Sequence, residues 1–484
     1  MDTKALRQKI LDLAIHGKLV PQDPNDEPAS VLLERIRAEK ERLIKEGKIK
    51  KGKKSAKTSD KPHYPFELPK GWVWCKLDDI VVFQGGYAYK SNTYVNQSMW
   101  QVIRIGNVKD DSLNLKIQPV FVDEKTGKET QKYQLHKNDI LFTMTGTKGK
   151  RDYFYSVKVQ TIEKKLLLNQ RVGCLRLFTP YINVDFLCLS LKCQYILDAI
   201  FSTETGNVSQ GNIGSESTLN LKIAIPPFAE QCRIVTEVNK WYMAIEQLEQ
   251  EKDKLQSSID QVKSKVLDLA IHGKLVPQDP NDEPAIELLK RINPKAEITC
   301  DTPQYGKLPF VIPSSWEWVK LSDIAKSNIG LTYRPTDIVS TGVPVYRSNN
   351  IRNGKIDTTD LVKVSTKILE KQLLHVGDLL ICARNGSRNL IGKNAIISEL
   401  KEPTSFGAFM AVCRSAYNQW IRIVLNSEYF DRYLDDSNSA TINQVTQKML
   451  LALPIPLPPH QEQHRIVAKI EELFAQLDKI EASL

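Results

Sequence analysis

Hydrophobic residues alternate at spacings of four and three between positions 234 and 269, without a break across five heptads. A seven-residue repeat of this kind is typical of a helix that packs against a partner helix in a left-handed coiled coil. At 1.5 Å per residue the helix would be roughly 54 Å long. Ordinary core-facing helices rarely stay in phase for this distance, so the pattern predicts a coiled coil. The predicted seam contains Ile234, Val238, Trp241, Ile245, Leu248, Leu255, Ile259, Val262, Val266 and Leu269, with Lys252 as its one polar position.

The C-terminal segment repeats the first part of this helix. The repeat lies at an offset of 232 residues (466 minus 234), and both copies begin with the pattern PP-x-x-EQ-x-RIV, at 226–235 and at 458–467. The same alternation of four and three continues from there to the last residue, Leu484. The C-terminal seam residues are Ile466, Ile470, Leu473, Leu477 and Ile480.

The N-terminal segment repeats the last part of the central helix. Residues 11–29 read LDLAIHGKLVPQDPNDEPA and are identical to residues 267–285, an offset of 256 (267 minus 11). By these offsets the chain ends almost at the position where it begins. We therefore expect two similar units in a circular arrangement that is opened within one helix, with neighbouring termini. The split helix halves would lie antiparallel to the central helix, giving a pseudo-two-fold molecule in one chain.

A second pattern, of short hydrophobic strands and a late helix, also occurs twice. The segment W-x-W-x-KL-x-DI occupies 72–80 and 316–324, VIRIGNV at 102–108 matches VYRSNNI at 345–351, and LHKNDIL at 135–141 matches LHVGDLL at 374–380. Short strands rich in β-branched residues followed by helices favour an α+β fold. The predicted divisions are the N-terminal half-helix, repeat and basic linker (1–62), a first domain (63–224), the central helix with its repeat and linker (225–305), a second domain (306–456) and the C-terminal half-helix (457–484).

Composition adds few constraints. The 484 residues are 41% hydrophobic and 26% charged, as in a soluble globular protein, and the formal net charge of +10 is compatible with nucleic-acid binding without proving it. No apolar run is long enough to span a bilayer, and the charged start MDTKALRQKI does not resemble a signal peptide. Eight cysteines without a C-x-x-C pair indicate reduced thiols and no zinc site. We expect a cytoplasmic protein without a metal or cofactor.

Two local features allow more than one interpretation. His16 and His272 lie in the repeated LAIHGKL, where a metal or catalytic role competes with the favourable placement of a histidine in the last turn of a helix. We favour the structural role. A lysine run between residues 48 and 57 is either a solvated linker or an arm that follows phosphates. The corresponding linker at 292–308 lacks the run, so we favour the linker.

The order of variable domain, long helix, variable domain and long helix resembles the specificity subunit of type I restriction–modification systems. The resemblance rests on the LAIHGKLVPQ repeats and the PP-x-x-EQ-x-RIV helix starts, and it covers essentially the whole chain. It implies two target-recognition domains that each read one half of a split DNA sequence. It also implies an antiparallel coiled coil that spaces these domains and docks methyltransferase subunits, with restriction subunits joining the larger complex. Such a subunit has no catalytic activity of its own. At roughly 3.4 Å per base pair, a helix of about 54 Å limits the distance between half-sites to about sixteen base pairs.

The candidate DNA-binding residues lie in the loop after each repeated Asp-(Ile/Leu)-Leu and in the Arg–Asn segment before it. Arginine and lysine can bind guanine O6 and N7, and asparagine can bind adenine N6 and N7. Residues shared by both domains are better explained as fold or phosphate contacts, because readers of different sequences should differ. The shared ones are Arg104, Arg347, Asn107 and Asn350. The unshared candidates are Thr145, Thr147, Lys148, Lys150, Arg151, Asn349, Arg384, Asn385, Ser387, Arg388 and Asn389, with Lys90 and Arg334 as phosphate contacts.

Four other functions compete with this one. An amino-methyltransferase should carry a polar residue before Pro-Pro-aromatic, but Ile225 occupies that position before Pro226–Pro227, and the motif recurs as a helix start at Pro458–Pro459. No Pro-Asp…Glu-x-Lys nuclease pattern is present. A coiled-coil adaptor that binds only proteins, or a methyltransferase-associated specificity module outside type I systems, remains an alternative.

Overall fold

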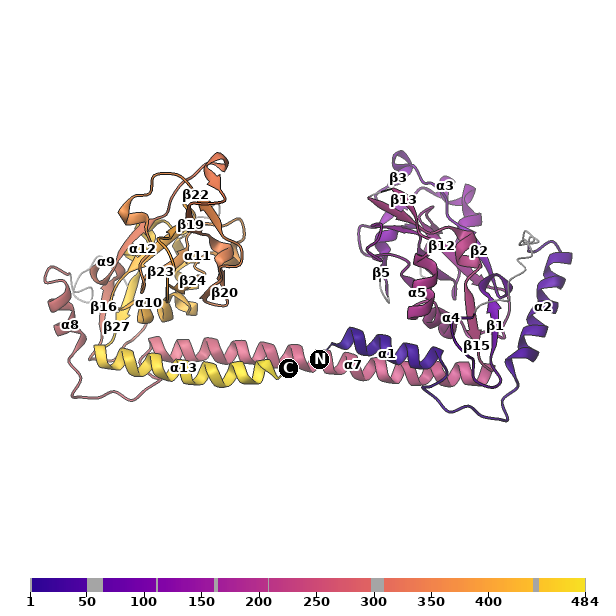
Figure 1. The fold of residues 1–484 in the computed structure, drawn as a ribbon, viewed down its shortest axis with the longest axis horizontal. Helices are drawn as coiled ribbons and strands as arrows, with labels where there is room; N and C mark the ends of the chain where they lie inside the picture. Colours follow the sequence, from indigo (N-terminus) through magenta and orange to yellow (C-terminus); the bar gives the residue numbers. More distant parts are fainter. Residues whose placement is uncertain are drawn as a thin grey trace. The chain divides into compact units, whose positions relative to one another are not determined.

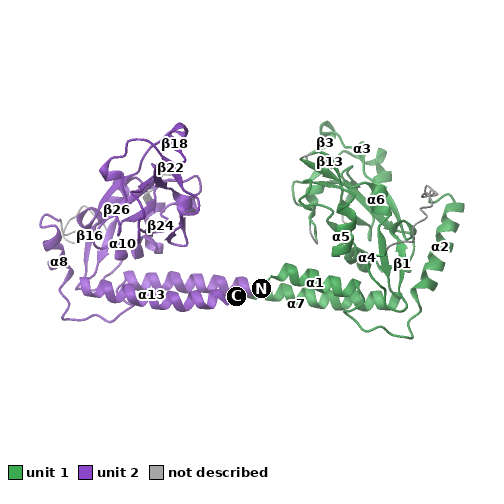
Figure 2. Ribbon diagram, viewed as in Figure 1, with its two compact units in different colours: residues 1–251 green, residues 252–484 purple. Residues whose placement is uncertain are grey.

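The computed structural model describes residues 2–49, 64–109, 112–160, 164–207, 209–296, 309–437 and 444–483. They form two compact units, residues 1–251 and residues 252–484, which Figure 2 shows in different colours. Helix α7 (Phe228–Ile271) contributes its first part to unit 1 and its last part to unit 2. Each unit consists of a sheet-rich domain and a pair of helices.

The central sheet of unit 1 separates two hydrophobic layers. In β8, Ile140 and Phe142 pack with the helices of the domain, whereas Leu141 packs against a second sheet. Because successive side chains of a strand point to opposite faces, a strand covered on both faces is hydrophobic at every position. The order of the central sheet is β10 (Ser156–Lys158), β8 (Ile140–Thr143), β12 (Val172–Leu177) and β2 (Val81–Gly85).

The second sheet of unit 1 contains a parallel pair, β11 with β4, beside antiparallel neighbours. Its order is β11 (Lys165–Leu168), β4 (Trp100–Ile103), β7 (Val120–Val122) and β3 (Tyr94–Val95). Smaller sheets pair β1 (Val73–Lys76) with β15 (Lys222–Ile225), β5 (Val108–Lys109) with β6 (Ser112–Leu113), and β13 (Thr205–Asn207) with β14 (Gln210–Asn212) and β9 (Thr145–Gly146). The helices are α1 (Thr3–Ile15), α2 (Ala29–Lys45), α3 (Glu124–Glu129), α4 (Val184–Ser190), α5 (Gln194–Phe201) and α6 (Ser215–Leu219).

Unit 2 repeats this topology. Its central sheet has the order β24 (Asn394–Ile396), β23 (Leu379–Cys382), β26 (Met410–Arg414), β17 (Lys326–Ile329), and its second sheet the order β25 (Ser405–Phe406), β19 (Val343–Tyr346), β22 (Val362–Val364), β18 (Ile338–Val339). Two small sheets pair β16 (Glu317–Lys320) with β27 (Pro454–Leu457) and β20 (Ile351–Arg352) with β21 (Lys355–Ile356). The helices are α8 (Ala285–Ile292), α9 (Leu321–Ile324), α10 (Asn418–Leu425), α11 (Glu428–Ser437), α12 (Gln447–Ala452) and α13 (His460–Ala482). The predicted duplication of an α+β domain is confirmed.

Each unit contains an antiparallel helix pair (Figure 1). In unit 1, Arg7 of α1 forms an ion pair of 2.9 Å with Glu249 of α7, while Gln22, just after α1, donates to Glu230 at the other end of this stretch of α7. In unit 2, Gln256 contacts Glu481 near the end of α13, and Gln278 donates to Glu462 near its beginning. Residue numbers rise along one helix and fall along the other, so both pairs are antiparallel, as the repeats predicted.

The structure buries one column of the predicted seam and exposes the other. Val238, Ile245, Ile259 and Val266, seven residues apart or multiples of seven, are at most 8% exposed, as are Ile234, Ile466 and Ile470. In the other column Ile234 is buried and Leu269 is partly buried, but the four residues from Trp241 to Val262 are 40–54% exposed, so the expectation of a fully buried seam is wrong for this middle stretch. Each unit provides one partner helix, and one helix covers only one side of α7. The exposed seam residues are Trp241, Leu248, Leu255 and Val262, and Ile480 of α13 is 45% exposed; Leu473 and Leu477 are partly buried.

The repeated flanking motifs fix the start of α7 and α13 to their domains. Glu230 is 1% exposed, and its carboxylate accepts hydrogen bonds from Trp72 Nε1 (3.0 Å) and Gln22 Nε2 (3.2 Å). Burial raises the pKa of Glu230, while these two hydrogen bonds lower it in part. Glu462 receives the equivalent bonds from Trp316 (2.9 Å) and Gln278 (2.6 Å). The repeated motifs therefore make the same buried contacts in both units.

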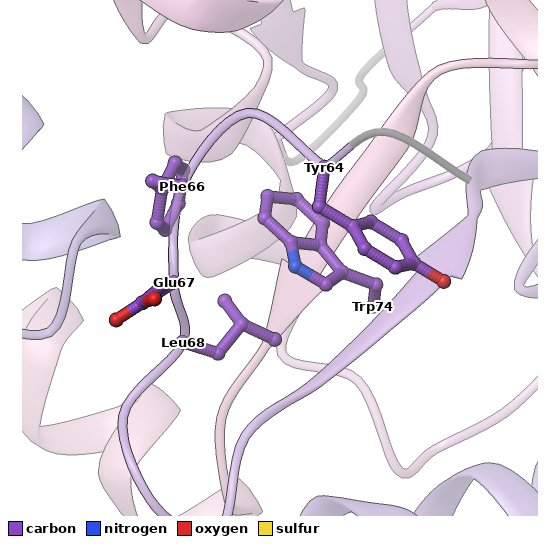
Figure 3. Close-up of a pocket in the computed structure, with 5 residues that line it drawn as sticks. All are labelled: Tyr64, Phe66, Glu67, Leu68 and Trp74. Carbon is purple, nitrogen blue, oxygen red and sulfur yellow. The ribbon is translucent and has the colours of Figure 1, made fainter. Parts of the chain in front are cut away.

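An aromatic groove lies where the first domain meets the end of α1. Tyr64, Phe66, Glu67, Leu68 and Trp74 line it, and the rings of Tyr64 and Trp74 stack with centroids 5.5 Å apart (Figure 3). Phe66 also packs on His16, at 4.0 Å between centroids. Unit 2 has the same packing of His272 on Phe310, at 4.0 Å. Because both units share this cluster and both histidine Nδ1 atoms contact a main-chain carbonyl of their own helix, the structural interpretation of the histidines is supported.

The recurring Gly86 and Gly330 are required by a close approach of two main chains. A Cβ on Gly86 would lie 2.1 Å from the carbonyl oxygen of Asn169, and one on Gly330 would lie 2.3 Å from that of Gly407. Main-chain atoms cannot rotate away as side chains do, so Gly86→Ala is expected to lower the free energy of unfolding by about 1–3 kcal/mol. Urea unfolding of the full chain measures this loss. Gly106→Ala, where no heavy atom lies within 4 Å, is the control; equal stability of both variants would contradict the prediction.

Two further expectations concern other parts of the chain. Most of the lysine run, from Lys50 to Lys57, lies outside the described residues, as do residues 297–308 of the corresponding linker. In the part of the chain that the structure describes, no helix combines the length and apolarity needed to cross a membrane.

Candidate nucleic-acid interface

The loop after β8 in unit 1 carries five of the predicted DNA-binding residues. Thr145 belongs to β9 and pairs with Asn212, and Thr147 is partly buried. Lys148 is exposed, and its Nζ donates to the carbonyl of Gly206 at 2.8 Å. Lys150 is also exposed. Thr145 and Lys148 therefore both contact the hairpin formed by β13 and β14.

Asp152 and Tyr153 hold this loop in shape. The Thr147 main-chain N–H donates to Asp152 Oδ1 at 2.7 Å, and hydrogen bonds from Thr147 lower the pKa of Asp152. Tyr153 is buried and donates from its hydroxyl to Glu204 Oε1 at 2.6 Å. Burial and then this bond to a carboxylate raise the pKa of Tyr153. Asp152 is therefore charged and Tyr153 protonated at neutral pH, and the hydrogen bonds that hold the loop are all formed there.

The equivalent loop of unit 2 contacts the predicted Arg–Asn segment directly. Asn385 Nδ2 donates to Ser348 Oγ at 3.3 Å, which joins this loop to the turn that contains Asn349. Arg384 is exposed, and its guanidinium lies over the ring of Phe409 at 5.5 Å. Ser387, Asn389 and Asn349 are exposed as well. In unit 2 the structure therefore brings the two predicted segments together.

Arg151 and Arg388 each form an ion pair with an aspartate on a helix of their own unit. Arg151 Nη1 contacts Asp198 of α5 at 2.7 Å, and Arg388 Nη2 contacts Asp435 of α11 at 2.6 Å. This equivalence was not visible in the sequence, because the two loops differ around these residues. Exposed ion pairs contribute little to stability, so both arginines could still exchange their partner for a phosphate.

The four shared residues have roles within the fold. Asn107 and Asn350 are 2% and 1% exposed, and each donates two hydrogen bonds from its amide to main-chain carbonyls. Arg104 Nη2 donates to the carbonyl of Gln118 at 2.8 Å, and Arg347 Nη2 contacts Asp360 at 3.2 Å. Such contacts agree with the interpretation that these four residues support the fold.

Lys90 and Arg334 begin equivalent 3-10 turns. Both are exposed, and each precedes a short turn, η2 (Ser91–Thr93) in unit 1 and η7 (Pro335–Asp337) in unit 2. Their exposure leaves them available for phosphate contacts. Among the described residues of each unit, no hydrogen bond or ion pair joins Lys90 or Arg334 to the loop after the β8 or β23 strand.

Two exposed features beside the candidate loops were not predicted. Phe409 is 60% exposed, and its carbonyl accepts from Ala383 N at 2.9 Å; in unit 1 the carbonyl of Arg171 accepts from Met144 N in the same way. An aromatic residue in one unit thus replaces a cation in the other. The second feature is the β13–β14 hairpin. The signal that could have revealed it is the segment TGNVSQGN at 205–212, a short polar stretch with a glycine near each end.

Within the described ranges, no three His, Cys, Asp or Glu side chains are grouped as a metal site. The candidate surfaces instead carry cations, amides and hydroxyls on fixed loops, in two copies that differ from each other. This combination suits DNA, since cations bind phosphates and amides and guanidinium groups bind base edges.

Comparison with protein families decides the assignment. The model of the type I restriction modification DNA specificity domain matches residues 69–257 and 313–484, which together are most of the chain. The chain belongs to the type I specificity family. The first matched stretch contains the α+β domain of unit 1 and most of α7, and the second contains that of unit 2 and all of α13, so the family repeat coincides with the structural repeat.

Two specificity subunits from Escherichia coli are similar along almost the whole chain. The type I restriction enzyme EcoAI specificity subunit is 31% identical, over 99% of this chain and 90% of the relative. The EcoEI specificity subunit is 28% identical with the same coverage. A solved structure described as the basis of complex assembly and conformational transition of the type I R-M system has a TM-score of 0.60 and 18% identity, covering 87% of this chain and 94% of that one. This likeness supports the type I specificity fold.

Proposed function

We propose that this chain is the DNA-reading subunit of a type I restriction–modification complex, in which each domain reads one half of a split DNA target. The observation that carries the proposal is one topology with two different polar surfaces. Both units place a fixed loop after the middle strand of the central sheet, but Thr145 in one unit corresponds to Arg384 in the other. The two positions correspond because Thr145 pairs with Asn212, and Arg384 with Gln444.

Within each domain we propose different tasks for the predicted residues. Exposed residues of the loops are the base-reading candidates, because their side chains can reach base edges. Lys90, Arg334, Lys148 and Lys150 suit phosphates, which position a protein without specifying sequence. Asn107 and Asn350 support the fold, since their amides are already used. The exposed candidates for base reading are Arg384, Asn349, Ser387 and Asn389 in unit 2.

We also propose that α7 and its partner helices dock methyltransferase subunits. The exposed column of α7 supports this, since Trp241 and Leu248 in unit 1 and Leu255 and Val262 in unit 2 are each at least 40% exposed. Apolar side chains at heptad spacing are the surface that a further helix covers in a helical bundle. Methylation and cleavage would then reside in the partner subunits, with restriction subunits joining the larger complex.

A methylation map tests the proposal. The chain is co-expressed with the methyltransferase subunit of a type I system that it binds, and the host DNA is sequenced for modified adenines. The expected result is one split motif, with two short blocks around a fixed gap. Exchange of residues 384–389 for the unit 1 loop should change one block and leave the other. An uninterrupted motif would exclude two separate readers, and a stable complex without methylation would favour the adaptor function.

A further inference from the structure

The β13–β14 hairpin of unit 1 has two chemically different faces. Thr205 lies opposite Asn212, and Asn207 lies opposite Gln210, in an antiparallel register. Directly opposed residues project from the same face of a ribbon, and Gln210 Nε2 lies 3.3 Å from Asn212 Oδ1 on that face. Thr205, Asn207 and Gln210 are exposed, and Asn212 is partly buried. One face of the hairpin therefore carries three amides and one hydroxyl.

The opposite face of the hairpin carries the glycine pair Gly206 and Gly211, which allows it to pack closely against the domain. A Cβ on Gly211 would lie 2.2 Å from Glu204 Oε1 and 2.7 Å from the Tyr153 hydroxyl oxygen. Gly206 has a φ of +117°, and a Cβ there would lie 2.1 Å from the carbonyl oxygen of Gln210. Gly206 is therefore required by its backbone conformation and by the main chain of Gln210, whereas a side chain at position 211 would have to displace the Glu204 carboxylate. The seat fixes the direction in which the polar face points.

The loop that contains β9 and Lys148 holds the hairpin through its main chain. Lys148 donates to the Gly206 carbonyl at 2.8 Å, and β14 pairs with β9 through Gly211 and Asn212. Glu204 accepts from both Gly149 N (3.1 Å) and the Tyr153 hydroxyl (2.6 Å). The side chain of Lys148 and the main chain of this loop are already engaged in these contacts, so the loop supports the hairpin. The side chains left facing outward are those of the hairpin.

We propose that the β13–β14 hairpin enters the major groove of DNA and reads adenine-containing base pairs through Asn207 and Gln210. The inference rests on the proposed function and assigns the reading element of unit 1 to a segment outside the predicted residues. Asn212, joined to Gln210 on the same face, holds the Gln210 amide in place. Lys148 is a positioning residue that holds the hairpin through the Gly206 carbonyl, and Lys148 and Lys150 supply positive charge for phosphates.

The chemistry of this face favours DNA over a protein partner. The major groove is wide enough for a two-stranded ribbon, and side-chain amides can donate to adenine N7 and accept from its N6 amino group. The four described residues of this face include no apolar side chain to anchor a protein interface, where buried aromatic or aliphatic residues normally supply the affinity. Exposed Lys148 and Lys150 beside it supply charge opposite to that of phosphates.

The test compares variants of the full chain in complex with the methyltransferase subunit. Asn207→Ala and Gln210→Ala are expected to weaken binding to the mapped target about 10- to 100-fold each, a loss typical of one bidentate base contact. The methylation map should lose its preference at adenine positions of one block, while the other block is unchanged. Gln97→Ala, an exposed amide between β3 and β4, is the matched control and should leave affinity and map as they are.

A second variant tests the seat of the hairpin. Gly211→Ala keeps both amides but crowds the Glu204 carboxylate and the Tyr153 hydroxyl on which the ribbon rests, and it should alter the same block. Lys148→Ala should reduce affinity for all sequences and lower the salt dependence. If both amide variants keep the wild-type map and affinity, the hairpin does not read bases, while the split motif of the wild type still upholds the proposed function. A wild-type complex without a split motif would overturn both.

Discussion

Replacing Trp420 with alanine is expected to destabilise unit 2 by about 3–5 kcal/mol, the usual cost of deleting a large buried side chain. Trp420 lies in α10 and is 1% exposed. Its ring meets that of Trp316 edge-on at 5.4 Å, and its Nε1 donates to the carbonyl of Pro456 at 2.8 Å. The truncation therefore leaves a cavity and an unpaired carbonyl at once. Urea unfolding of the full chain, followed by fluorescence and circular dichroism, measures the loss.

Trp241→Ala is the matched control for this prediction. Trp241 is 46% exposed on α7, so its truncation should change stability by less than about 1 kcal/mol. The proposed docking surface predicts a different effect, a weaker complex with the methyltransferase subunit in a pull-down or titration. Equal stability losses for the two tryptophan variants would contradict the burial pattern. An unchanged complex with Trp241→Ala would remove this residue from the docking surface.

Replacing Arg384 with alanine is expected to reduce binding of the specific target about 5- to 150-fold and to relax one base position in one block, the range that corresponds to about 1–3 kcal/mol for a bidentate guanidinium–guanine contact. Two backbone contacts and one side-chain contact hold Arg384 in place. Its backbone is bridged to Gln444, its N–H donates to the carbonyl of Phe409 at 3.0 Å, and its guanidinium lies over the Phe409 ring. Binding titrations with matched and single-substituted duplexes at several salt concentrations measure the effect.

Arg388→Ala serves as the comparison. Because Arg388 is paired with Asp435, its replacement should weaken the binding of all DNA sequences alike, and only slightly. Arg384→Lys should resemble Arg384→Ala in specificity, since an ammonium group cannot make the planar two-point contact. A uniform loss across all duplexes for Arg384→Ala would show that Arg384 binds a phosphate. Retention of the wild-type affinity would show that it contacts no DNA.

The family and the duplication followed from the sequence because both leave marks that need no tertiary information. A heptad repeat records helix periodicity directly, and residues 11–29 are identical to residues 267–285. The domain motifs recur in the same order, so one topology was expected twice and was found. Recurrence of Glu230 as Glu462 was visible as well, but its reason, a buried carboxylate shared with Trp72 or Trp316, required the structure.

The candidate site was only partly predictable, because a side chain's availability depends on distant residues. Lys148 and Arg151 looked equivalent in sequence, yet one contacts Gly206 and the other Asp198, 47 residues away. The hairpin reaches the loop from a segment beyond α5, so no local pattern connected the two. Sharing between copies was the useful signal: it marked Asn107 and Asn350 as structural, which their burial supports.

The sequence by itself determined the family, the α+β class, the two copies and the antiparallel helix pairs, because periodicity and repetition are properties of the chain alone. Only the tertiary structure decided which column of the α7 seam is covered and which polar side chains of the domains remain outside. Both questions depend on where a partner element lies. A heptad pattern specifies that two columns are apolar, but the number of helices packed around them determines how many are buried.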